Sequence, residues 1–295
     1  MHGRIGILGI ACLSLLGGCS EASLPPPPES KKQETALAQS FDPAAAGTIR
    51  GRIVWDGDAP APEETLVRAI AYHPTFYKNP ARFVTPHVPT VHPEHRGVGN
   101  AVVYLRGIDP RRSKAWDHAN VRVEFHERQL LVQQGKQYAS LGFVRRGSAV
   151  EIVNRDTEYH NLHARGAAFF ALPLIEPNRV HERALPQTGI VDLSCGAGYY
   201  WLHAHLFVAE HPYYTRTDAD GNFALEQVPA GKYEVVCWLP SWHVTRKEVD
   251  PETGIIARLA WAQPQEQVRP LQVQVGRTSE VTYRWTRAMF ANVGK

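Results

Sequence analysis

One short stretch, SCGAGYYWLHAH at positions 194–205, brings a thiol and two imidazoles close together in the chain. Cys195 supplies the thiol, and His203 and His205 supply the imidazoles. Thiolate and imidazole are ligands that copper sites in proteins use together. A further histidine, His160, lies upstream in EIVNRDTEYHNLHA. These residue types predict metal chemistry if the fold brings them together.

The elements that must position these residues are predicted to be β-strands. Runs of strand length, alternating or continuously apolar, occur at 48–55, 100–108, 121–135, 148–154, 189–194, 199–208, 232–239, 271–275 and 280–285. Turn signals such as Asp56-Gly57 and Asp220-Gly221 separate them, in a chain with 22 prolines and 23 glycines. We therefore expect an all-β fold, and this number of strands accounts for two β-sandwiches.

The composition and the absence of common catalytic motifs limit the classes of function that the sequence predicts. The chain has 295 residues, enough for one large or two small domains, and its 32 Lys+Arg nearly balance its 29 Asp+Glu. This balance predicts no nucleic-acid partner. The sequence has no nucleophile elbow with a Ser-His-Asp order, no phosphate loop and no convincing pair of carboxylates. We therefore expect a protein that is not an enzyme.

The N-terminus has the pattern of a secretory signal. His2 and Arg4 precede an apolar run at 5–16, which is short for a membrane span and has the length of a signal-peptide core. The following LGGC resembles the bacterial lipobox. The resemblance implies that 1–18 is a lipoprotein signal peptide and that Cys19 is the site of lipid attachment, with acyl chains holding the protein on a membrane. The alternative is an ordinary signal peptide in which Cys19 is incidental.

Residues 19–46 are predicted to be a proline-rich tether. Four consecutive prolines at 25–28 favour extended polyproline II, and the rest of the segment has little apolar content. The folded part should begin near Gly47. We expect the protein in the cell envelope, anchored to a membrane and facing the periplasm or the exterior.

The stretch YYTRTDADGNFALEQVPAGKYEVVCWL (213–239) resembles the carboxypeptidase regulatory-like domain. The matching positions are Thr217, Asp218, Gly221, Phe223, Leu225, Val228, Pro229, Gly231 and Tyr233. The resemblance implies a seven-stranded prealbumin-type sandwich. In it, Asp220-Gly221 would form a hairpin turn, and Phe223 and Leu225 would share one face.

Two strands that such a domain needs lie far upstream of the hairpin. They are GRIVWDG (51–57) and AVVYLRG (101–107). The simplest interpretation is a discontinuous sandwich made of 47–109 and 207–288, with a second domain at 110–206 inserted in one of its loops. The alternative is a linear order, in which the early strands belong to the middle domain.

The middle region resembles cupredoxins. The motif residues are Asn154, Asp156, His160 and Asn161, followed downstream by Cys195. The resemblance implies a Greek-key sandwich in which His160 and Cys195 are copper ligands and the asparagine fixes the ligand loops. Two further ligands are missing. Gly198 and Tyr199 stand where a histidine is expected, and Leu202 and His203 stand where the axial methionine is expected.

The favoured interpretation is therefore a degenerate copper site without metal. In it, Tyr199 and Leu202 fill the space of the lost ligands. A blue-copper centre needs two imidazoles and a thiolate, so copper binding is the alternative only if His163, His203 or His205 supplies the second imidazole. His203 and His205 share one face of the expected strand, opposite Ala204 and its apolar neighbours.

Three other features have a structural explanation as well as a functional one. Trp238 and Trp242 could form a sugar-binding platform, or be tryptophans of a core or domain interface. The histidine-bearing segment 73–95 could bind a metal loosely, or be a proline-rich surface loop. Cys195 and Cys237 could pair in an oxidising compartment.

As a whole, the chain resembles planctomycete-type bacterial lipoproteins that combine a cupredoxin-like domain with a carboxypeptidase regulatory-like domain. We expect a membrane-anchored binding or scaffold protein whose partner is an envelope protein or a glycan. A copper-binding electron-transfer or copper-holding protein is the first alternative, and a carbohydrate-binding envelope protein is the second.

Overall fold

The computed structural model describes residues 41–67, 69–70 and 81–291, which belong to one compact unit. The expected signal segment, Cys19 and most of the expected tether lie outside the described residues. A 3-10 turn, η1 (Pro43–Ala45), is capped by the side chain of Asp42. Strand β1 (Ala46–Trp55) follows it and begins one residue before the expected Gly47.

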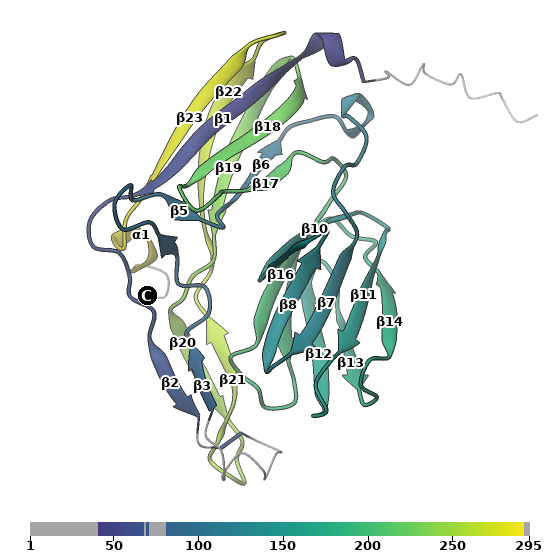
Figure 1. Cartoon of the computed structure of the whole chain (residues 1–295), viewed down its shortest axis with the longest axis vertical. Helices are drawn as coiled ribbons and strands as arrows, with labels where there is room; N and C mark the ends of the chain where they lie inside the picture. The colour runs from purple at the N-terminus through teal and green to yellow at the C-terminus, as the bar shows by residue number, and fades with distance from the viewer. Residues whose placement is uncertain (1–40, 68, 71–80, 292–295) are drawn as a thin grey trace, which may run out of the picture. The chain divides into compact units, whose positions relative to one another are not determined.

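One sandwich consists of a four-stranded and a three-stranded sheet (Figure 1). The four-stranded sheet, in the order β17-β6-β19-β22, contains β6 (Val102–Arg106), β17 (Tyr214–Arg216), β19 (Gly231–Leu239) and β22 (Gln265–Val273). In the other sheet, β1 lies between β18 (Asn222–Pro229) and β23 (Thr278–Trp285). It is antiparallel to β18 and parallel to β23.

The two sheets share one apolar core because alternate residues of their strands point inward. Ile49 and Ile53 of β1 and Val103 and Leu105 of β6 belong to this core. These two strands precede 110–206, and their pairing partners in both sheets follow it. Such non-local pairing is what an inserted segment produces, while the domain boundaries themselves stay a prediction.

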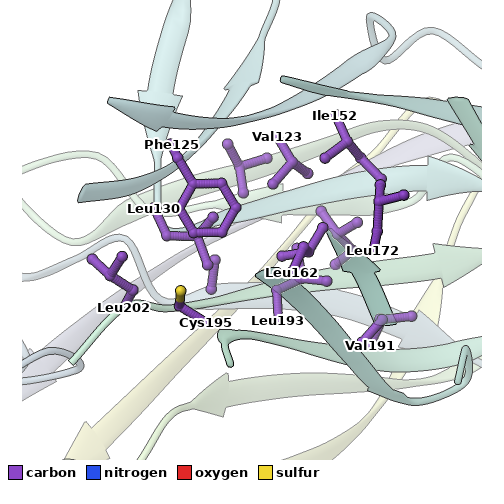
Figure 2. Close-up of a cluster of buried hydrophobic side chains, with 14 of the residues drawn as sticks. Val123, Phe125, Leu130, Ile152, Leu162, Leu172, Val191, Leu193, Cys195 and Leu202 are labelled. Atoms are coloured by element: carbon purple, nitrogen blue, oxygen red, sulfur yellow. The ribbon is translucent and has the colours of Figure 1, made fainter. Parts of the chain in front are cut away.

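The strands from β7 to β16 form a second sandwich of two five-stranded sheets, and β16 continues three residues past the expected boundary at 206. The first, in the order β14-β11-β7-β8-β9, contains β7 (Val121–His126), β8 (Gln129–Gln134), β9 (Gln137–Ala139), β11 (Ala149–Asn154) and β14 (Val180–Ala184). The second, in the order β10-β16-β15-β12-β13, contains β10 (Leu141–Arg145), β12 (His160–Gly166), β13 (Phe170–Leu174), β15 (Gly189–Cys195) and β16 (His203–Ala209). Figure 2 shows the apolar cluster between them, which includes Val123, Ile152, Leu162 and Val191.

A smaller apolar cluster joins outer faces of the two sandwiches. Val102 and Tyr104 of β6 and Trp238 of β19 pack with Phe143 of β10 and Phe207 of β16. The ring centroids of Phe207 and Trp238 are 5.0 Å apart. The same strands therefore serve two cores, since Val103 and Leu105 of β6 point the other way into the first sandwich.

The expected all-β class with two sandwiches is confirmed. The remaining described elements are short: β2 (Glu64–Val67), β3 (Ala81–Val84), β4 (Thr90–Val91), β5 (Val98–Gly99), η3 (Pro110–Arg112), β20 (Val244–Val249), β21 (Ile256–Trp261) and α1 (Ala288–Ala291). β2 pairs with β3, β4 with β5, and β20 with β21. Among the described residues, no helix has the length and apolar character needed to cross a membrane.

The expected hairpin at Asp220-Gly221 is instead a tight turn between the two sheets, because β17 pairs with β6 and β18 pairs with β1. The motif residues hold this turn in place. The Asp218 carboxylate accepts hydrogen bonds from the backbone N–H groups of Asp220 and Asn222, at 3.0 and 2.8 Å. The Thr217 hydroxyl accepts from the Ala101 N–H at 2.9 Å and so ties the turn to the start of β6. Gly221 has φ of 81°, and a Cβ there would collide with the Ile53 carbonyl oxygen.

Replacing Gly221 by alanine should therefore destabilise the first sandwich. The left-handed backbone alone costs about 1–2 kcal/mol for a residue with a Cβ, and the collision adds to it. Gly57→Ala is the matched control, because Gly57 has φ of 79° with nothing within 4 Å of its added Cβ. Urea unfolding should give a larger loss of unfolding free energy for Gly221→Ala. Equal losses of unfolding free energy for the two variants would contradict this account of the turn.

Candidate functional site

His160 and Cys195 lie together inside the second sandwich. His160 begins β12 and Cys195 ends the neighbouring β15, and both side chains are buried. The Nδ1 atom of His160 is 3.6 Å from the Sγ atom of Cys195. In Figure 2 the sulfur of Cys195 points into the apolar cluster. The structure thus brings these two expected ligands together, while their role as ligands stays a prediction.

Asp156 forms a hydrogen bond with the other ring nitrogen of His160, the one that does not face Cys195. Its Oδ2 atom is 3.0 Å from Nε2 of His160, and the carboxylate also accepts from the backbone N–H groups of Glu127 and Arg128. Burial lowers the pKa of His160, but the hydrogen bonds to Asp156 and Cys195 outweigh it and the pKa is raised. Burial likewise opposes ionisation of Asp156, yet its hydrogen bonds with His160 and with the backbone of Arg128 and Glu127 leave its pKa lowered.

The rest of the surroundings is aromatic and apolar. The ring of Phe125 stacks on His160 at 4.4 Å, and the ring of Tyr199 lies 4.6 Å from it. Burial, followed by the charge of Glu158, raises the pKa of Tyr199, so its phenol stays protonated at neutral pH. Tyr199 therefore occupies space beside the imidazole.

Two asparagines organise the loops around this pair. The side chain of Asn154 donates to the Glu158 carbonyl at 2.8 Å and accepts from the Asp156 N–H at 3.0 Å, which shapes the turn before His160. Asn161 joins the two loops through its backbone, because its carbonyl accepts from the Gly196 N–H at 2.7 Å. Among the described residues, the side-chain oxygen of Asn161 has no hydrogen-bond partner.

None of the three histidines expected as substitute ligands reaches Cys195. His163 follows Leu162 on β12, so it points to the outer face of the sheet, where its ring lies over Gly196. His203 and His205 point to the same outer face, because Ala204 between them belongs to the inner core. In this structure all three lie on the face of the sheet away from the buried pair, and the alternative in which one of them supplies the second imidazole stays a prediction.

On that outer face, His203 and His205 meet His87 instead. His87 lies between β3 and β4, and its Nε2 is 2.7 Å from Nδ1 of His203. Burial, followed by the neighbouring histidines, lowers the pKa of His87, and burial also lowers that of His203. The Asp192 carboxylate lies 3.2 Å from Nε2 of His205. His87 belongs to the segment 73–95, for which the sequence predicts either loose metal binding or a proline-rich surface loop. No local signal in the sequence links His87 to β16.

The tryptophans and the second cysteine have structural roles. Trp238 and Trp242 are 1% and 9% exposed, so they are not an exposed platform for a sugar ring. Trp238 packs between the sandwiches, and Trp242 packs on Trp55. Cys237 and Cys195 are both free and belong to different clusters, so they do not pair. Burial raises the pKa of the Cys237 thiol to about 12.

Comparison with known proteins finds weak similarity to cupredoxins over about a third of the chain. An oxidised mutant of amicyanin is 16% identical, covers 33% of this chain and 96% of its own length, and has a TM-score of 0.25. A purple cupredoxin from Nitrosopumilus maritimus is 17% identical, with coverages of 31% and 99% and a TM-score of 0.25. A copper-containing nitrite reductase from Thermus scotoductus SA-01 is 16% identical, with coverages of 33% and 24% and a TM-score of 0.24.

No family model matches the sequence, and no curated protein matches it. At the identities and TM-scores of the solved structures, the similarity supports no conclusion about metal, activity or partners. Such conclusions have to come from the side chains of this chain.

The hydrogen bond between His160 and Asp156 should make stability depend on pH. Because the pKa of His160 is raised above 6.5, its contribution is complete below pH 6.5 and is lost as the pH rises through the raised pKa. Because the pKa of Asp156 is lowered below 3.8, its contribution is complete above pH 3.8 and is lost as the pH falls through the lowered pKa. The charged pair of His160 and Asp156 therefore contributes most to the unfolding free energy between pH 3.8 and pH 6.5.

Asp156→Asn should cost about 1.5–3 kcal/mol of unfolding free energy at pH 5–6 and less at pH 9, as measured by urea unfolding. Asp117→Asn is the control, since that carboxylate forms an ion pair with Lys114 and is half exposed. It should cost less than about 1 kcal/mol, with no loss of effect between pH 6 and 9. A cost for Asp156→Asn that is the same at both pH values would contradict the assigned charges.

Proposed function

We propose that this chain is a membrane-anchored protein of the cell envelope that acts as a binding or scaffold module and not as an enzyme. Its second sandwich would be a degenerate cupredoxin-like domain. The observation that carries the proposal is the closed surroundings of His160 and Cys195, where the rings of Phe125 and Tyr199 pack against the imidazole within an apolar cluster.

A copper centre of the cupredoxin kind does not fit these residues. It needs a second imidazole in the plane of the first imidazole and the thiolate. Here His163, His203 and His205 lie on the other face of the sheet. The buried contact between His160 and Cys195 instead links the ends of β12 and β15, together with the backbone bond from Gly196 to Asn161.

The proposal includes the origin of the two sandwiches. The first, with seven strands and a turn held by Thr217 and Asp218, would be a carboxypeptidase regulatory-like domain at 47–109 and 207–288. The cupredoxin-like domain at 110–206 would be inserted in it. The pairing of β1 and β6 with strands that follow the second sandwich supports this order.

The membrane anchor rests on the sequence alone. The apolar run and LGGC at 16–19 support lipid attachment at Cys19, and the proline-rich segment after it would hold the sandwiches away from the membrane. A partner protein or glycan of the envelope is the proposed ligand class.

Copper holding is the second candidate, because one observation favours it. Zinc and copper sites place sulfur and nitrogen ligands about 2.0–2.3 Å from the metal, and a 3.6 Å separation of Sγ and Nδ1 is compatible with both binding one ion. Asp156 behind Nε2 is the kind of carboxylate partner that ligand histidines have. For carbohydrate binding, the burial of Trp238 and Trp242 removes the residues that suggested it.

Copper titration separates the two candidates. The purified protein in its reduced state should show no intense thiolate-to-copper absorption band on addition of Cu²⁺, because the second imidazole is missing. Cys195→Ser and His160→Ala are the matched variants and should give the same spectra as the wild type. A stoichiometric band that both substitutions abolish would show that the pair is a working copper site.

The anchor is tested at the expected lipid-attachment residue. Cys19→Ala should release the protein from membranes or leave an unprocessed precursor, as seen by fractionation and mass spectrometry. Cys12→Ala is the control, because Cys12 lies in the expected signal peptide and should have no effect. An unchanged membrane fraction and an unchanged mature mass for Cys19→Ala would refute lipid attachment.

A further inference from the structure

Three imidazoles from distant parts of the chain converge on the outer face of the sheet that contains β16. His203 and His205 stand on β16, and His87 comes from the loop between β3 and β4. Each offers one ring nitrogen, and these nitrogens all lie within 4.8 Å of one another. The three ring centroids are 4.7 to 5.1 Å apart. The cluster is separate from His160 and Cys195, which lie inside the sandwich.

The spacing of the nitrogens is close to that of a metal site. Metal–nitrogen distances of about 2.0–2.1 Å place the nitrogens of a tetrahedral site about 3.3 Å apart. Here Nε2 of His87 and Nδ1 of His203 are 2.7 Å apart, a direct hydrogen bond. An ion between them would replace that bond and needs the two atoms to separate by about 0.6 Å.

A carboxylate lies behind one of the three rings. Asp192 of β15 pairs with His205 across the strands, and its Oδ1 atom is 3.2 Å from Nε2 of His205. A histidine that donates from Nε2 to a carboxylate carries its lone pair on Nδ1. This carboxylate–histidine arrangement orients metal ligands and raises their basicity. Asp192 also brings negative charge to the cluster.

The cluster opens into a cavity of about 220 Å³. Its walls include Arg165, Arg258, Ser194 and Trp261. Arg258 lies 3.6 Å from Glu248, and burial, followed by the charge of Arg258, lowers the pKa of Arg165. Two guanidinium groups beside three imidazoles provide hydrogen-bond donors and positive charge for an anion.

We propose that His87, His203 and His205 bind one divalent transition metal ion, Cu²⁺ or Zn²⁺, and that its open coordination position faces this cavity and takes a small anion. Imidazole suits both ions, and three protein ligands with one open position form a recurring kind of zinc site. The proposal goes beyond the proposed function and does not rest on it. The three histidines are separate from the His160–Cys195 pair that carries the proposed function.

Metal titration tests the site. The metal-free wild-type protein should bind one equivalent of Zn²⁺ in calorimetry. With Cu²⁺ it should give the electron paramagnetic resonance spectrum of a tetragonal site with nitrogen ligands, without a thiolate band. His87→Ala should lower affinity more than 100-fold, and Asp192→Asn about 10–100-fold. His126→Ala and His160→Ala are controls and should bind like the wild type.

The result that overturns the site is a wild-type protein that shows no nitrogen-ligated Cu²⁺, or binding that His87→Ala leaves unchanged. The wild-type spectrum shows whether nitrogen-ligated Cu²⁺ is present, and this result holds even if a variant fails to fold. Binding lost in His160→Ala but kept in His87→Ala would move the metal to the buried pair and would also contradict the proposed function. The two failures are therefore distinguishable.

Azide tests the anion part on the copper-loaded protein. Azide should change the copper spectrum and add an azide-to-copper absorption band. Arg165→Gln should weaken azide binding about tenfold or more without changing copper affinity, because it removes a charge from the wall and no ligand from the metal. A copper spectrum that azide does not change would overturn the open position, and equal azide binding by Arg165→Gln would overturn the role of the arginine.

Discussion

The alternation of side chains along β12, β15 and β16 is the constraint on which both sites depend. In β16, Ala204, Leu206 and Val208 fill the core, so His203 and His205 must face outward. The sheet then separates them from Cys195, whose side chain points inward from β15. A one-residue change of register would move every side chain of the strand to the other face and expose the apolar set. The burial of the core thus decides which donors can meet.

Inside the sandwich, this constraint leaves His160 and Cys195 with aromatic neighbours. The histidine keeps a carboxylate partner, Asp156, which also accepts two backbone hydrogen bonds from the turn after β7. Buried polar groups need such partners. The bonds from the backbone of Glu127 and Arg128 to Asp156, and the contact of His160 with Cys195, join segments that are distant in the sequence. The pair therefore serves to connect β7, β12 and β15 at one end of the sandwich, whether or not a metal ever binds there.

Outside the sandwich, the histidine cluster lies next to the apolar contact between the two sandwiches. Trp238 belongs to that contact, and its ring centroid is 5.1 Å from that of His205. The walls of the cavity come from both sides of the contact, with Asp192 and Arg165 from the second sandwich and Arg258 and Trp261 from the hairpin of β20 and β21. Packing of Phe207 against Trp238 thus brings polar groups from distant segments into one site.

The sequence by itself determined the all-β class, because alternation of apolar residues is a local signal that strands such as 148–154 and 232–239 carry clearly. It also predicted a tight turn at Asp220-Gly221, although the strands that flank this turn pair in different sheets and do not form the expected hairpin. It did not reveal β20, whose VTRKEV is mostly exposed and lacks an apolar face. Only the tertiary structure decided that His87 joins His203 and His205, that Asp192 lies behind His205, and that Trp238 and Trp242 are buried. The physical reason is that such contacts depend on strand order and register between segments far apart in the chain, which no local pattern encodes.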